Sequence, residues 1–69
     1  MEIDDYEIAL LKHLVYGMLQ DEIAHSYKMQ GIKPFGLSSI EKRLGMLRTQ
    51  FDAKNGTQLV AKAKDLGLI

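Results

Sequence analysis

Residues 38–51 place apolar side chains at the spacing of one helix face, and no other feature constrains the fold as strongly. Four apolar residues recur at i, i+4, i+7 and i+11: Ile40, Leu44, Leu47 and Phe51. This spacing predicts a helix with a single apolar stripe, opened by a cap from Ser38 or Ser39. The opposite face is small, polar and partly basic: Ser38, Lys42, Gly45 and Thr49, flanked by Glu41 and Met46. Such a helix fits the major groove of DNA, although ordinary surface helices share the pattern.

The bulk properties of the chain exclude several classes of protein. Sixty-nine residues allow one domain with a thin core, which we take as residues 1–69. The absence of cysteine excludes a disulfide-stapled miniprotein, a zinc-thiolate site and thiol catalysis. The acidic start lacks the basic and apolar regions of a signal peptide, and the apolar runs are too short to span a membrane. We therefore expect a cytoplasmic protein.

The charge of the chain is balanced in sum but uneven along its length. A net charge of zero argues against nucleic-acid binding when taken alone. However, residues 1–27 hold one lysine and six carboxylates, whereas residues 28–54 hold six basic residues and two carboxylates. This split is either a chance feature of a small chain or a basic face that meets an anionic partner.

The remaining patterns predict three more helices and an all-α fold. Asp4 or Asp5 is expected to cap a first helix that ends at Gly17. A second helix is expected at about residues 20–28, followed by a loop over residues 30–37 in which Ile32, Phe35 and Leu37 pack down. An Asn-Gly turn with positive φ and a Thr57 cap should start a fourth helix, which ends at Gly67. The apolar faces expected for these three helices are Ile8, Leu11, Leu14, Val15 and Met18; Ile23, Ala24 and Tyr27; and Leu59, Val60, Ala63 and Leu66.

Four segments resemble the LuxR/GerE-type helix-turn-helix family, in the order in which that family has them. Residues 17–24, GMLQDEIA, resemble its opening of helix 2, and residues 39–44, SIEKRL, its recognition-helix start. Residues 55–61, NGTQLVA, and residues 63–69, AKDLGLI, resemble the beginning and end of its fourth helix. The resemblance implies a four-helix DNA-binding domain of a transcription regulator, in the free-standing form or as an isolated domain. In that family the third helix reads the major groove and the fourth often forms a homodimer contact.

The sequence also departs from the family pattern. About six extra residues separate Ala24 from Ser39, and Leu19 stands where the family has a Ser or Thr cap. Glu41 and Gly45 stand where the family has basic contacts. The resemblance therefore supports the scaffold more than the code by which bases are read.

The expected DNA contacts follow from placing residues 38–51 in the major groove and from this resemblance. Lys42 is expected to contact a guanine or a phosphate. Glu41 is expected to accept from cytosine N4 or to orient an arginine or lysine beside it. Ser38, Ser39, Arg43 and Arg48 are expected to meet phosphates, with an Arg48–Asp52 ion pair as the alternative for the arginine. Gly45 permits close approach of the DNA backbone. By resemblance, the phosphate contacts also include Lys54 and Asn55, and the homodimer surface is Leu59, Val60, Lys62 and Ala63.

Other chemistries find little support in the sequence. His13 and His25 are twelve residues apart on different expected helices, which is far from a metal site. No phosphate loop or nucleophile motif is present, so we expect no enzyme, cofactor or metal. The sequence therefore favours a DNA-binding regulator that partners double-stranded DNA and a second copy, and also other transcription proteins. The alternative is a protein-interaction module that kept the scaffold and lost DNA binding.

Overall fold

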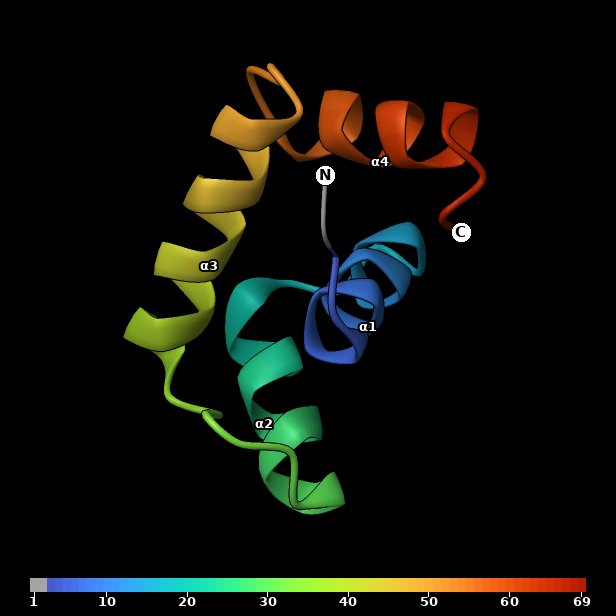
Figure 1. The fold of residues 1–69 in the computed structure, drawn as a ribbon. Helices are drawn as coiled ribbons and strands as arrows, with labels where there is room; N and C mark the ends of the chain where they lie inside the picture. The colour runs from blue at the N-terminus through green and yellow to red at the C-terminus, as the bar shows by residue number, and fades with distance from the viewer. Residues whose placement is uncertain (1–2) are drawn as a thin grey trace.

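Four helices make up the domain in the computed structural model, which describes residues 3–69. They are α1 (Asp5–Val15), α2 (Gln20–Gln30), α3 (Leu37–Gln50) and α4 (Gly56–Asp65), and the described residues contain no strand. The predicted all-α four-helix fold is confirmed. Figure 1 shows α3 along one side, α4 across one end and α2 at the other end, with α1 beside them. No helix among the described residues is long and apolar enough to cross a membrane.

Every helix contributes to one hydrophobic core, and α3 contributes most. Its predicted stripe is confirmed, because Ile40, Leu44, Leu47 and Phe51 are all buried. The other helices add Leu10 and Leu11, Ile23 and Tyr27, and Leu59 and Ala63. Full burial of one large apolar side chain stabilises a fold by about 1.5–3 kcal/mol. Packing of these side chains therefore fixes the back of α3 against the other helices.

Two edges of the core differ from the prediction. In α1 the buried face includes Leu10, whereas Val15 is 40% exposed because it is the last residue of the helix. In α4 the apolar face ends at Ala63, and Leu66 is 60% exposed because it lies beyond the last turn. The helical spacing of apolar residues identified both helices correctly, but Val15 and Leu66, at their C-terminal ends, lie outside the core.

Both ends of α1 and the C-terminal end of α4 are closed as the sequence predicted. The Asp4 side chain accepts from the Glu7 backbone at 2.8 Å, and Glu7 accepts from the Asp4 backbone at 3.3 Å. Gly17 and Gly67 both adopt a φ of 75° just after their helices. A left-handed residue there lets the following backbone N–H reach back to the helix, and Leu68 does so to the Ala63 carbonyl at 2.9 Å.

The predicted N-caps of α3 and α4 are wrong by two or three residues. Helix α3 begins at Leu37 with Gly36 as its N-cap, so Ser38 and Ser39 lie inside the first turn and cap nothing. Helix α4 is capped by Asn55, whose Oδ1 accepts from the Gln58 backbone at 2.9 Å, rather than by Thr57. The positive φ of this turn falls on Asp52, at 55°.

The connection between α2 and α3 is held by Ile32 and by a hydrogen bond from α1. Helix α2 continues to Gln30, two residues further than predicted, and Gly31 closes it with a φ of 72°. The Tyr6 hydroxyl then donates to the Pro34 carbonyl at 2.7 Å. Ile32 packs against the core as predicted, but Phe35 and Leu37 are 37% and 43% exposed. The loop is therefore held at Ile32 and Pro34, while Phe35 and the first residue of α3 remain accessible.

Candidate nucleic-acid interface

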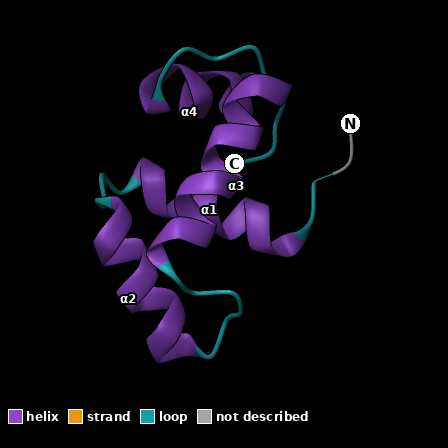
Figure 2. Cartoon of the chain, turned by 90° about the vertical axis from the view of Figure 1, so that its left-hand side faces the viewer, coloured by secondary structure: helices purple, strands orange, loops and turns teal. Residues whose placement is uncertain are grey.

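The side of α3 that faces away from the core carries mostly exposed residues. Figures 1 and 2 both place α3 between α4 at one end of the domain and α2 at the other. Ser38, Glu41, Lys42 and Thr49 are exposed, Met46 is 56% exposed, and Gly45 is half-buried. The prediction that this face points away from the core is confirmed. Here we call Ser38, Lys42, Gly45, Met46 and Thr49 the outer face of α3.

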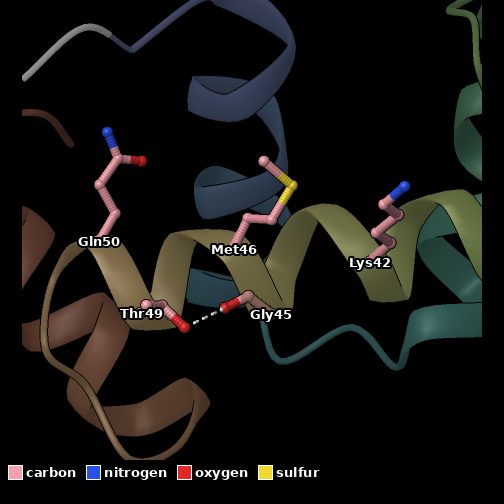
Figure 3. Close-up of a pocket in the computed structure, with 5 residues that line it drawn as sticks. All are labelled: Lys42, Gly45, Met46, Thr49 and Gln50. Atoms are coloured by element: carbon pink, nitrogen blue, oxygen red, sulfur yellow. Dashed lines mark hydrogen bonds between the residues drawn. The ribbon is translucent and has the colours of Figure 1, made fainter.

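The middle of this face is a shallow depression centred on Gly45. Figure 3 shows Lys42, Gly45, Met46, Thr49 and Gln50 around it. The Thr49 hydroxyl donates to the Gly45 carbonyl at 3.2 Å, so it remains on the helix surface with an oxygen free to accept. Because Gly45 has no side chain, another backbone can approach the helix here.

Lys42 and Arg43 differ sharply in their surroundings. Lys42 is exposed and has no ion-pair partner within residues 3–69. Arg43 instead turns toward the start of α1, where its guanidinium lies 3.5 Å from Asp4 and 5.0 Å from the centre of the Tyr6 ring. The Tyr6 ring in turn meets the Tyr27 ring edge-on at 5.0 Å. Arg43 is therefore partly committed to the fold, whereas the Lys42 ammonium is free.

The Tyr6–Tyr27–Arg43 cluster was missed at the level of sequence. The Tyr27 hydroxyl donates to the Tyr6 carbonyl at 2.9 Å, and burial raises the pKa of Tyr27 well above its ordinary value of 10.0. Burial also raises the pKa of Tyr6, an effect that the nearby Arg43 charge opposes. These residues are far apart in the chain, so no local spacing links them.

The remaining expected DNA contacts lie on α3 and in the α3–α4 turn. Arg48 is half-buried, its guanidinium lies near Gly45, and it forms no ion pair with Asp52. Lys54 is exposed in the α3–α4 turn. The Asn55 side-chain oxygen accepts the capping hydrogen bond from the Gln58 backbone. Its side-chain NH₂ therefore remains to donate to DNA. Ser39 is half-buried near Arg43, so Ser38 is the more accessible hydroxyl.

The predicted homodimer surface on α4 is wrong for two of its four residues. Leu59 and Ala63 are both fully buried, because a core this small needs the apolar face of α4 to close it. Their side chains are not accessible to a second copy. Val60 is half-buried, and the Lys62 ammonium donates to the Asp52 carbonyl at 2.7 Å.

Comparison with known proteins places the whole chain in one family. A family model described as a family of unknown function, DUF5932, matches residues 1–69. The chain belongs to this family. No curated protein and no solved structure matches it.

In this DUF5932 domain, His13 serves as a link between α1 and α2. Its Nδ1 lies 2.6 Å from the Ala9 carbonyl and its Nε2 lies 3.0 Å from the Ser26 hydroxyl. Its ring also packs edge-on against Tyr27. Within residues 3–69 no three His, Asp or Glu side chains gather as a metal site would require. The candidate site considered below is the outer face of α3, which offers the Lys42 ammonium and the hydroxyls of Ser38 and Thr49.

Proposed function

We propose that this domain binds double-stranded DNA through the outer face of α3, as a transcription regulator of the helix-turn-helix type. The observation that carries the proposal is the Lys42 ammonium, which is exposed and without an ion-pair partner among residues 3–69. It stands at the middle of a helix whose opposite side is locked into the core. A rigid helix with a free cation on its outer side suits the dimensions of the major groove.

The neighbours of Lys42 have complementary roles in this proposal. Lys42 donates to a phosphate or to a guanine edge, and Ser38 donates to a phosphate. No side chain among residues 3–69 caps the start of α3, so its first backbone N–H groups are available to an anion. Gly45 allows the DNA backbone to come close, and Lys54 adds charge at the α3–α4 turn.

One domain of this size offers few phosphate contacts, so specific binding requires two copies on two half-sites. With Leu59 and Ala63 buried in the core, a homodimer contact has to use other residues. Val60 is the remaining apolar member of the expected surface, and it lies beside Leu14, Val15 and Met18 in one depression between α1 and α4. We place the second copy there.

The test is a titration of a fluorescent random duplex, followed by anisotropy at about 50 mM and about 200 mM salt. The proposal predicts binding that weakens steeply between the two conditions. Lys42→Ala should weaken it and reduce the slope of log K against log salt by about 0.9 if Lys42 contacts one phosphate. Lys12→Ala, which removes an exposed lysine of α1, is the matched control and should leave binding unchanged. Equal effects of the two variants, or no binding at low salt, would reject the proposal.

A second function is favoured by the charges around α3. Arg43 is paired with Asp4, and the carboxylate of Glu41 adjoins Lys42 on the same helix. Both reduce the attraction for phosphate. A protein-interaction module on this scaffold is therefore the alternative, and it predicts no salt-sensitive DNA binding in the same titration.

A further inference from the structure

Two exposed leucines lie together where the starts of α2 and α3 meet. Leu19 is 66% exposed and Leu37 is 43% exposed. They line one depression with the half-buried Met18. A group of accessible apolar side chains is a feature that marks binding surfaces rather than folding needs. Here we call this depression the Leu19–Leu37 cup.

The fold itself gains little from a leucine at position 19. Leu19 is the N-cap residue of α2, a position that favours Ser, Thr, Asp or Asn because their oxygens accept from the first N–H groups. Leucine has no such oxygen, and only Glu22 acts at this helix start, by accepting from the Leu19 backbone at 2.8 Å. The side chain therefore neither caps the helix nor fills the core.

The rim of the cup is acidic. Asp21 and Glu41 line the depression beside the leucines, and neither is paired with a basic residue in the described part of the chain. Glu22, also exposed, lies next to Asp21. Carboxylates in this position repel phosphate and acidic peptides and attract Lys and Arg.

We infer that the Leu19–Leu37 cup binds a helical segment of a partner protein that presents leucine-like side chains flanked by Lys or Arg. The apolar floor takes the aliphatic side chains, and the carboxylates of Asp21 and Glu41 take the basic flanks. The cup lies on the α2 side of α3 and does not include Lys42. The inference therefore does not depend on DNA binding by the outer face of α3.

The probe is a synthetic amphipathic helix with leucines at i and i+4 flanked by lysines. It is titrated into the ¹⁵N-labelled domain, and a matched peptide has glutamates in place of the lysines. We expect amide shift changes at residues 18–22 and 37–41, and binding of the lysine peptide about tenfold tighter than that of the glutamate peptide. Equal binding of both peptides, or changes elsewhere on the domain, would overturn the inference.

Three variants separate the cup from the fold and from the DNA proposal. Leu19→Ser should abolish peptide binding while stabilising α2, because serine is a good N-cap. Its loss of binding therefore cannot come from unfolding. Leu66→Ser removes a leucine of α4 that is 60% exposed and should leave peptide binding unchanged, as should Lys42→Ala. If Leu19→Ser binds the peptide like the unaltered protein, or residues 18–22 and 37–41 broaden with protein concentration alone, the partner is not the one inferred.

Discussion

Tyr6 offers the sharpest test of how the long connection before α3 is held. Its hydroxyl donates to the Pro34 carbonyl at 2.7 Å, and its ring lies between Tyr27 and the Arg43 guanidinium, at 5.0 Å from each. Tyr6→Phe removes only the hydrogen bond, whereas Tyr6→Ala removes all three contacts. The pair of variants therefore separates the hydroxyl from the ring.

The expected losses follow from these contacts. The hydrogen bond contributes about 0.5–1.5 kcal/mol, and its exposed acceptor puts Tyr6→Phe at the low end. The aromatic pair adds about 0.5–1.5 kcal/mol, and the cation–π contact about 0.5–1 kcal/mol. We expect Tyr6→Ala to lose about 1.5–3 kcal/mol, a large share of the roughly 3–10 kcal/mol typical of a domain this size.

Urea unfolding followed by circular dichroism measures both losses. The control is Tyr16→Ala, which truncates a tyrosine that is 82% exposed and should change the unfolding free energy by less than about 0.5 kcal/mol. Tyr6→Ala should also increase amide hydrogen exchange in residues 31–36. A Tyr6→Ala protein as stable as Tyr16→Ala would refute the claim that this ring holds the connection.

Three further predictions concern α3, α4 and the tyrosine cluster. Gly45→Ala should stabilise the fold by up to about 1 kcal/mol, because the added Cβ would meet only the Arg48 side chain, at 3.8 Å. Weaker DNA binding by the same variant would support close approach of DNA at Gly45, and unchanged binding would contradict it. Asn55→Ala should cost about 1 kcal/mol in urea unfolding, with Thr57→Ala costing less; the reverse order would contradict the observed cap. Burial raises the pKa of Tyr27 above 10.0 in the folded state. The buried neutral hydroxyl therefore favours the folded state below about pH 10, and this stabilisation is lost at higher pH as Tyr27 ionises in the unfolded chain. The urea midpoint should therefore fall less between about pH 8 and about pH 11 in Tyr27→Phe than in the unaltered protein, and an equal fall would contradict this.

The buried side of the fold could be predicted well from the sequence. Ile40, Leu44, Leu47 and Phe51 follow the helix period, and all are buried because one face of an amphipathic helix has to pack. Gly17 and Gly67 were also identified correctly, since a left-handed residue after a helix favours glycine strongly.

Other features could not be predicted, for physical reasons. Ser38 and Ser39 are good caps by type, but the backbone entered the helix one residue before them, at Leu37. The Arg43–Asp4 pair and the Tyr6–Pro34 bond join distant segments, and no local pattern encodes them. Leu59 and Ala63 show a further limit. The sequence pattern of an apolar helix face is the same whether that face packs in the core of its own domain or against a second copy.

Contact between DNA and the outer face of α3 can be followed residue by residue in an NMR titration with a duplex. The ¹⁵N-labelled domain is titrated at about 50 mM salt with a random duplex, and amide shifts are followed along the chain. We expect the largest changes on the outer face of α3, at Ser38, Lys42, Gly45, Met46 and Thr49, and their reversal when salt is raised to about 200 mM. Changes confined to α1 and α4, or a spectrum unaltered by DNA, would contradict it.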